Sequence, residues 1–380
     1  MEQQNIKSLS PKKDSSKVKI LYIATNPDIG GIPKYLLEIA KYLPKNIEPY
    51  YVISTQGYLS VELIKLGVKE EHIFFVPMTN SIINITKHIN SNLKVLKIIK
   101  TIKPDIIHCN STTGAIVGAV SGAITKIPTI YTVHGWPFTN GLPLWKRLFY
   151  RFLEFFMCRV YKKIICVSEY DRQIGIKALP MYKNKMVTVH NGISDISEEY
   201  RKIEFSNDEL KIVMISRFCP QKDPYTLIFA VHELIKEGYN IKLDLYGYGQ
   251  ELDKVLKCIK NQNNSNIQYK GEITDVTPIL KDYDVYALIS NYEGLPIGII
   301  EAMRAGLPIL VSDVGGNSEC IKDNGYLVKR QNIMDCRKQI KVIWDNRENI
   351  ATLGQNSRNF FEEEFSVQKM VNKTLEEYKV

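Results

Sequence analysis

Short β-rich runs alternate with helical patterns along most of the chain, in two successive series separated by a polar stretch at about 195–208. Strands that alternate with helices fold as right-handed βαβ units, which build parallel sheets. A chain of 380 residues is too long for one simple core and suits two domains of roughly 150–200 residues each. We therefore predict an α/β protein with two Rossmann-like domains that face each other across a cleft.

The same pattern sets the expected domain limits. We expect a polar N-terminal tail at 1–17, a first domain at 18–194, a second at 195–365, and a C-terminal helix at 366–380 that packs back on the first domain. The expected strands are 18–24, 49–54, 73–76, 105–109, 128–133, 163–167 and 186–189 in the first series, and 211–216, 241–246, 267–270, 284–289, 308–311 and 325–328 in the second.

Composition excludes several classes of protein. The seven cysteines show no CxxC spacing, so neither a disulfide framework nor a zinc site is indicated, and a reducing cytoplasm is the expected location. The first 17 residues contain lysines but no apolar segment of the kind that a signal peptide needs. No uninterrupted apolar run approaches the ~20 residues of a membrane-spanning helix.

Charge is unevenly divided between the two halves. Residues 1–194 hold 26 Lys and Arg against 12 Asp and Glu, a net of +14, whereas residues 195–380 hold 24 against 29, a net of −5. A basic half beside an acidic half suggests that one domain meets a polyanion, either an anionic bilayer or a nucleic acid.

Ligands of open α/β sheets bind beyond the carboxyl ends of the strands, and several informative residues follow expected strands. Gly30 and Gly31 follow the first strand, where backbone N–H groups could face an anion; a tight turn without a ligand is the alternative. His134 follows the fifth strand and is either structural or catalytic. In the second series, Arg217 and Lys222 share a loop and offer two cations to a phosphate, unless both are simply solvated.

Two glutamates flank a turn in the stretch "EGLPIGIIE", Glu293 and Glu301. The first follows an expected strand and the second lies one turn into an expected helix at 297–305. A sugar near Glu293, phosphates at the helix N-terminus and a ribose near Glu301 would fit this spacing. The alternative is a capping glutamate and an unrelated surface glutamate.

The pair Glu293–Glu301, in the context "EG…G…EAMRAG", resembles the EX7E signature of family 4 retaining glycosyltransferases of the GT-B fold. Other motifs of that family occur in the expected order, so the resemblance covers about residues 18–365. These motifs are Gly30-Gly31, "HGW" at 134–136, "VSE" at 167–169, "HNGI" at 190–193, Arg217 with Lys222, "GYG" at 247–249 and "SDVGGNSE" at 312–319.

The resemblance implies a role for each matched residue. Arg217 and Lys222 would bind the diphosphate of the donor, and Glu301 the ribose hydroxyls. His134 would contact the transferred sugar near the reacting carbon. The N-terminal domain would bind the acceptor and the C-terminal domain the nucleotide sugar. The remaining expected donor-binding residues are Gly30, Gly31, Gly247, Glu272, Glu293, Gly294, Leu295, Pro296, Ile297 and Gly298.

By the same resemblance, the reaction would proceed by front-face attack, with the leaving phosphate helping to deprotonate the acceptor. No carboxylate nucleophile is then required. The sequence "DYD" at 282–284 matches the DxD string of metal-dependent enzymes, but it falls between an expected helix and the start of a strand, away from the cleft. We therefore expect neither a metal nor another cofactor.

Residues 142–165 hold six basic residues and one acid among dense aromatics, with apolar residues at helical spacing. Such a helix can lie on an anionic membrane, although part of its apolar stripe must pack on the sheet. No nucleic-acid-binding module is visible, so nucleic acid is not an expected partner.

We therefore expect a cytoplasmic enzyme, working at the inner face of the membrane, that transfers a hexose or N-acetylhexosamine from a UDP-sugar to a lipid-linked acceptor. By the resemblance, it would serve capsule, O-antigen or exopolysaccharide assembly. The alternatives are a nucleotide-sugar epimerase of the same architecture, which lacks the EX7E pattern, and a non-catalytic partner subunit, which should have lost some of Glu293, Glu301, Arg217 and Lys222.

Overall fold

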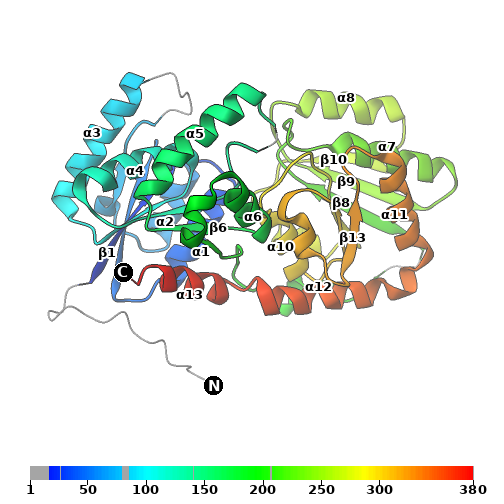
Figure 1. Ribbon diagram of the computed structural model, residues 1–380. Helices are drawn as coiled ribbons and strands as arrows, with labels where there is room; N and C mark the ends of the chain where they lie inside the picture. Colours follow the sequence, from blue (N-terminus) through cyan, green and yellow to red (C-terminus); the bar gives the residue numbers. More distant parts are fainter. Residues whose placement is uncertain (1–16, 26, 79–84, 140, 206–207, 380) are drawn as a thin grey trace. The chain divides into compact units, whose positions relative to one another are not determined.

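The computed structural model describes residues 17–25, 27–78, 85–139, 141–205 and 208–379. Its strands form two separate sheets, and every pairing that we describe within them is parallel (Figure 1). The prediction of two parallel-sheet α/β domains is thus confirmed.

The first sheet contains seven strands in the order β3-β2-β1-β4-β5-β6-β7. Its strands are almost continuously apolar, as is typical of parallel strands that are buried on both faces. The strands are β1 (Val18–Ile23), β2 (Ile47–Ile53), β3 (Ile73–Phe75), β4 (Ile106–Cys109), β5 (Thr129–Val133), β6 (Lys163–Cys166) and β7 (Met186–Thr188). The helices along this part of the chain are α1 (Gly31–Tyr42), α2 (Tyr58–Lys65), α3 (Ile85–Ile102), α4 (Thr112–Thr125), α5 (Leu144–Val160) and α6 (Glu169–Ala178).

The second sheet contains six strands in the order β10-β9-β8-β11-β12-β13. The strands are β8 (Leu210–Ile215), β9 (Ile241–Tyr246), β10 (Ile267–Gly271), β11 (Val285–Leu288), β12 (Ile309–Ser312) and β13 (Gly325–Val328). The helices are α7 (Pro224–Lys236), α8 (Leu252–Gln262), α9 (Thr277–Leu280), α10 (Ile297–Arg304), α11 (Ile333–Asp345), α12 (Ile350–Glu364) and α13 (Val367–Glu377). Short 3₁₀ helices are η1 (Glu70–His72), η2 (Pro180–Lys185), η3 (Glu198–Tyr200), η4 (Gly315–Cys320) and η5 (Arg347–Asn349).

Strand order reverses once in each sheet, between β1 and β4 in the first and between β8 and β11 in the second. At such a reversal the loops after two neighbouring strands diverge to opposite faces of the sheet, which opens a crevice at its carboxyl edge. In the second sheet these two loops carry Arg217, Lys222 and Glu293. The topology therefore places the predicted charged residues at the expected edge.

The chain divides into two compact units. The first runs to Val133 and also includes Glu154–Ile165 and the chain from Val371 onward, whereas the second comprises His134–Leu153 and Cys166–Met370. The N-terminal part of α5 therefore belongs to the second unit and its C-terminal part to the first. The site described below is built from residues of the second unit.

The C-terminal residues are fixed to the first unit by buried polar groups. The Tyr378 hydroxyl lies 2.6 Å from His108 Nδ1 and 3.2 Å from the Tyr22 hydroxyl. On its other side, the His108 ring contacts Thr132 Oγ1 through Nε2 at 2.7 Å. These groups tie the residue that follows α13 to strands β1, β4 and β5.

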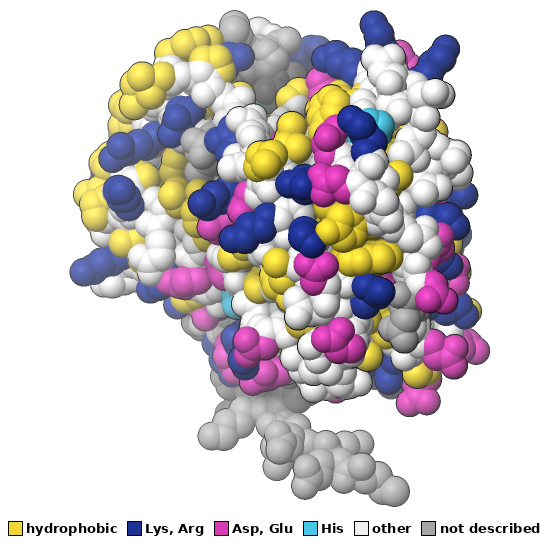
Figure 2. Space-filling view, turned by 90° about the vertical axis from the view of Figure 1, so that its right-hand side faces the viewer, with side chains coloured by type: hydrophobic (Ala, Val, Ile, Leu, Met, Phe, Trp, Pro, Cys, Tyr) yellow, Lys and Arg dark blue, Asp and Glu magenta, His cyan; other side chains and the backbone are white. Residues whose placement is uncertain are grey.

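Acidic and basic side chains are interspersed on the face shown in Figure 2. Arg337 of α11 pairs with Glu237, which follows α7, at 2.5 Å, and Lys341 pairs with Asp345 within α11 at 2.9 Å. Across the described residues, no helix is both long and apolar enough to cross a membrane.

Candidate functional site

Two loops at the carboxyl edge of the second sheet are held together by their backbones. The first follows β8 and the second follows β11. Asp223 N donates to Ile289 O at 2.9 Å, and Asn291 N donates to Gln221 O at 2.7 Å. These bonds bring the side chains of residue 222 and residue 293 to the same place.

Glu293 is almost fully buried, and its carboxylate is held by two side chains from the neighbouring loop. Lys222 Nζ donates to Oε1, and Gln221 Nε2 donates to Oε2 at 2.9 Å. The exposed fractions of the Lys222 and Glu293 side chains are 13% and 5%. A buried carboxylate is stable only when it is paired and hydrogen-bonded, so these contacts fix its orientation.

Glycines let the η4 segment approach the backbone of the Glu293 loop. Gly316 N donates to Gly294 O at 2.8 Å. Gly315 has a φ of +60°, and a Cβ there would lie 2.1 Å from Glu293 O. Asn191 adds a side-chain bond, from Nδ2 to Leu295 O at 2.8 Å. The loop is therefore clamped from two sides, which preorganises the position of the carboxylate.

Glu301 lies on the second turn of α10, which begins after Pro296. Both glutamates act on the buried Tyr286: burial raises the pKa of this phenol strongly, and the negative charges of Glu301 and Glu293 raise it further. The helix approaches β11 closely at Gly298, where a Cβ would lie 2.5 Å from the Tyr286 hydroxyl. The two carboxylates thus both influence one tyrosine.

Gly247 and Gly249 pack against the loop after β8. A Cβ on Gly247 would lie 1.8 Å from Ser216 O, and one on Gly249 would lie 2.3 Å from Phe218 O. Phe218 N also donates to Tyr248 O at 2.7 Å. These glycines therefore shape the loop that carries Arg217 and Lys222.

His134 lies beside the same loop cluster. The position of a Cβ on Gly294 would be 3.3 Å from His134 O and 3.4 Å from Asp171 Oδ2. Burial lowers the pKa of His134 to about 3, so its imidazole is neutral at physiological pH. A neutral imidazole can donate or accept a hydrogen bond but cannot serve as a cation.

Asp171 is a buried carboxyl group close to this position. Its Oδ2 accepts from Ser168 Oγ at 2.9 Å, and its backbone O accepts from Trp136 Nε1 at 2.7 Å. Burial raises the pKa of Asp171 to about 7, while the Ser168 hydrogen bond opposes that shift. The group therefore titrates near neutral pH, and its Oδ2 lies 3.4 Å from the position that a Cβ on Gly294 would occupy.

Glu319 joins the η4 segment to α6 and to the loop after β7. Its carboxylate accepts from the backbone N–H groups of Glu169 at 2.8 Å and Tyr170 at 2.7 Å, and contacts His190 Nε2 at 2.9 Å. The hydrogen bonds from His190, Tyr170 and Glu169 together outweigh desolvation by burial, so the pKa of Glu319 is lowered. Glu319 therefore stays ionised and fixes α6 beside the site.

The structure thus gathers most of the predicted residues within the second unit. Lys222, Glu293, Gly294 and His134 lie together, and Arg217 is exposed on the loop that holds Lys222. Glu272 is exposed after the edge strand β10.

Four further predicted positions have other surroundings. The side chains of Leu295, in the loop, and Ile297, the first residue of α10, are buried. Gly30 and Gly31 stand at the start of α1 in the first unit, and a Cβ on Gly31 would meet no atom within 4 Å.

The sequence reasoning missed four residues that hold this arrangement: Gln221, Asn191, Asp171 and Glu319. Asn191 and Glu319 stand inside quoted motifs, and Gln221 precedes Lys222, so their places in the chain were a usable signal. Asp171 carried no such signal, because nothing in the local pattern predicts that it is buried.

Solved structures define the class of this fold. HepE of Anabaena, solved with UDP and glucose, superposes with a TM-score of 0.79 at 18% identity, covering 94% of this chain and 98% of HepE. TarM of S. aureus, solved with UDP, superposes with a TM-score of 0.76 at 16% identity, covering 96% of this chain and 100% of TarM. The protein has the GT-B fold of glycosyltransferases.

Sequence comparison gives the family. Residues 29–195 match the model described as Glycosyltransferase Family 4, and residues 195–360 match that of Glycosyl transferases group 1. An Escherichia coli relative, UDP-Gal:alpha-D-GlcNAc-diphosphoundecaprenol alpha-1,3-galactosyltransferase, is 27% identical over 97% of this chain and 98% of its own. The O-antigen biosynthesis glycosyltransferase WbnH of E. coli is 26% identical over 86% of this chain and 90% of its own. The chain belongs to the family 4 type of glycosyltransferases.

Proposed function

We propose that this glycosyltransferase is a retaining hexosyltransferase that needs no metal. It moves a hexose or N-acetylhexosamine from a UDP-sugar to a lipid-linked acceptor of surface-glycan assembly, including capsule-type polymers, as a peripheral protein at the inner face of the cytoplasmic membrane. The observation that carries this proposal is the buried Lys222–Glu293 contact beside Arg217, at the strand-order reversal of the second sheet. The E. coli relative whose name specifies a UDP-galactose donor and a diphosphoundecaprenol acceptor supports the choice of substrates.

Arg217 and Lys222 provide the positive charge that the leaving nucleoside diphosphate needs. Breaking the glycosidic C–O bond leaves an oxocarbenium-like sugar and a diphosphate with an added negative charge. Preorganised cations stabilise that charge by several kcal/mol relative to the ground state. Lys222 is held in place by Glu293, so little reorganisation is required when the donor binds.

Glu293 acts as an acceptor of hydrogen bonds from the transferred sugar, not as a nucleophile. Its carboxylate already accepts bonds from Lys222 and Gln221, and such bonds reduce its nucleophilicity. His134, neutral because of burial, contributes a hydrogen bond to the sugar. The acceptor hydroxyl attacks from the face that the diphosphate leaves, and a leaving-group phosphate oxygen takes its proton, which retains the anomeric configuration.

The cationic side chains take the place that a metal fills in other transferases. The DxD-like string "DYD" supports this view by its position. Asp284 is buried beside the start of β11, accepts from Lys211 N at 2.9 Å and pairs with Lys202 at 2.9 Å, so it is already engaged at the amino end of the strand.

The first test is a thermal-shift panel of UDP, GDP, ADP and CMP, each with and without EDTA. A ligand at 100 times its Kd should stabilise the protein by about 2.7 kcal/mol. We expect a shift with UDP alone that EDTA does not reduce. Loss of that shift in EDTA would contradict the metal-free proposal, and silence with every nucleotide would contradict the donor site itself.

Stereochemistry needs a separate measurement. With a UDP-α-sugar, proton NMR of the new glycosidic bond during the first minutes of reaction should show an α linkage. A β linkage would overturn the retaining mechanism. Conversion of the UDP-sugar into its epimer without an acceptor would instead identify an epimerase.

A further inference from the structure

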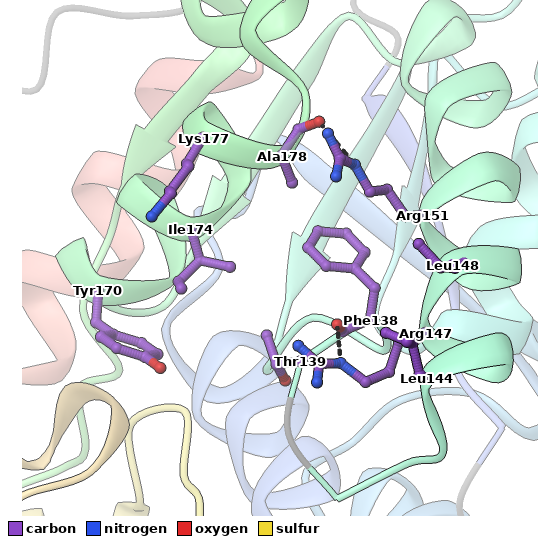
Figure 3. A pocket seen from close by; sticks show the side chains of 10 residues that line it. All are labelled: Phe138, Thr139, Leu144, Arg147, Leu148, Arg151, Tyr170, Ile174, Lys177 and Ala178. Atoms are coloured by element: carbon purple, nitrogen blue, oxygen red, sulfur yellow. Dashed lines mark hydrogen bonds between the residues drawn. The ribbon is translucent and has the colours of Figure 1, made fainter.

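A groove lies between α5 and α6 in the second unit, with the segment after His134 as its floor (Figure 3). Its volume is about 430 Å³, within the range of ligand-binding clefts. It is lined by Phe138, Thr139, Leu144, Arg147, Leu148, Arg151, Tyr170, Ile174, Lys177 and Ala178.

Two arginines of α5 are fixed at this groove through one nitrogen each. Arg147 Nε donates to Phe138 O and Arg151 Nε donates to Ala178 O, both at 3.1 Å. These bonds hold the planar groups in place and leave their Nη atoms for another acceptor. Figure 3 shows Arg151 above and Arg147 below the Phe138 ring, with Ile174 and Lys177 of α6 to its left.

The described residues provide no carboxylate that pairs with the cations of the groove. Among the residues that the structure describes, no carboxylate pairs with Arg147, Arg151 or Lys177. The one acid of α5, Glu154, is fully buried. Arginine forks match the oxygens of a phosphate, and two of them with a lysine suit a ligand carrying more than one negative charge.

The other lining is apolar and continues outside the groove. Leu144 and Leu148 are 67% and 56% exposed, and the neighbouring Trp145 is 64% exposed. The Phe138 ring, which is buried, stacks on Trp136 with centroids 5.0 Å apart and forms a rigid floor. A ligand that fits both linings carries a compact anion joined to an apolar chain.

We propose that this groove binds the diphosphate that joins the acceptor glycan to its lipid, with the lipid chain running along the exposed apolar side of α5. The proposal rests on the transferase function proposed above and assigns a subsite to its acceptor. A diphosphate carries more than one negative charge, which suits a groove lined by two arginines and a lysine. A bilayer of singly charged headgroups would need no enclosed groove.

The transfer assay compares two acceptors that carry the same sugar, one on a polyprenyl diphosphate and one on an uncharged octyl group. The test variant is Arg151→Gln with Lys177→Gln. Lys183→Gln, which removes an exposed charge of η2 outside the groove, is the matched control. We expect the KM for the diphosphate acceptor to rise about tenfold relative to that for the octyl acceptor, because charge-assisted bonds are lost. An unchanged ratio of the two KM values would overturn the proposal.

Two single variants, Arg151→Gln and Arg151→Lys, distinguish a loss of folding from a loss of acceptor binding. Arg151→Lys keeps the charge but loses the fork, so it should raise the KM ratio less than Arg151→Gln does. The thermal shift with UDP should match that of wild type in every variant. A variant that loses the UDP shift is misfolded, and the Arg151→Lys series then decides the outcome.

Vesicle sedimentation identifies the source of the anion and does not depend on transfer. Phosphatidylcholine vesicles containing polyprenyl diphosphate are compared with vesicles that carry the same total charge as phosphatidylglycerol. We expect at least threefold more wild-type protein on the diphosphate vesicles, and we expect Arg151→Gln with Lys177→Gln to remove that difference. Equal binding to both vesicles would show a general membrane contact and refute the diphosphate site. If no UDP-sugar supports transfer but this difference holds, the proposed function fails and the anion site stands.

Discussion

The loop cluster after β8 and β11 and the groove between α5 and α6 both contain cations, but these cations have different partners. In the loop cluster, Lys222 is nearly buried and contacts Glu293. In the groove, the Nε atoms of Arg147 and Arg151 donate to backbone carbonyls. The first region is preorganised by internal pairing, whereas the second keeps its charge for a partner from outside. The role of a charged side chain therefore depends on whether the protein itself supplies a partner of opposite charge, and not on the charge alone.

The largest expected effect comes from breaking the internal pair. Lys222→Ala should lower the transfer rate about 100-fold or more, because the leaving diphosphate loses a cation. It should also lower the free energy of unfolding by about 3 kcal/mol, because Glu293 stays buried without its ion-pair partner. Urea unfolding and initial-rate assays measure the two effects.

Arg217→Ala is the matched control, because Arg217 lies on the same loop and is exposed. It should lower the transfer rate while leaving the melting temperature unchanged. Equal losses of stability in the two variants would show that the Lys222–Glu293 pair contributes no more to stability than the exposed Arg217 does.

A second test adds a methyl group at the contact between η4 and the Glu293 loop and changes no charge. Gly315→Ala should lower the free energy of unfolding by about 2 kcal/mol, because its φ is +60° and the new Cβ would meet Glu293 O at 2.1 Å. Gly31→Ala, where a Cβ meets no atom within 4 Å, should leave stability unchanged. Chemical denaturation of the two variants checks this, and a harmless Gly315→Ala would contradict the clamp.

A third test uses the buried acid of α5. Burial raises the pKa of Glu154 to about 8, so the folded protein holds a proton there that the unfolded chain releases near its ordinary value. This contribution to stability is complete at low pH and is lost as pH rises to about 8. Glu154→Gln should remove that dependence and should stabilise the protein at pH 8.5 by up to a few kcal/mol relative to wild type.

The check on Glu154 is urea unfolding at pH 5 and pH 8.5, with Glu70→Gln, at an exposed position, as control. A pH profile of Glu154→Gln that follows wild type would show that this carboxyl group is solvated in solution.

The smallest effect on stability should come from the exposed side of α5. Leu144→Ser with Trp145→Ser should leave the melting temperature within a degree of wild type, because both side chains are mostly exposed, yet should reduce binding to diphosphate-containing vesicles several-fold. Met334→Ser, at an equally exposed apolar position on α11, should leave vesicle binding unchanged. Equal losses in both variants would mean that exposed apolar groups bind lipid without regard to the groove.

The sequence predicted the two parallel sheets because strand alternation and apolar runs are local signals. It also predicted which loops carry charge, since strand ends can be read from the pattern. It could not predict that Lys222 contacts Glu293, because 71 residues separate them and the contact depends on the pairing of two loops. The burial of Asp171 and Glu154 was hidden for the same reason: a polar residue gives no sign of how deeply its element packs.

The groove was only partly visible in the sequence. The aromatic and basic character of 142–165 was apparent, and so was its helical spacing. The approach of α6 was not, because that helix contributes Ile174 and Lys177 from a stretch with no distinctive motif.

The contacts of Tyr378 have a consequence for how the chain is made. Because the first unit includes residues from Val371 onward, Tyr378 is translated after the whole second unit. On the ribosome, the contact between His108 and the Tyr378 hydroxyl therefore cannot form until the entire second unit has been synthesised. A nascent chain would complete its second unit before its first, and a stop codon shortly before Tyr378 would remove the hydroxyl that lies beside His108 and Tyr22.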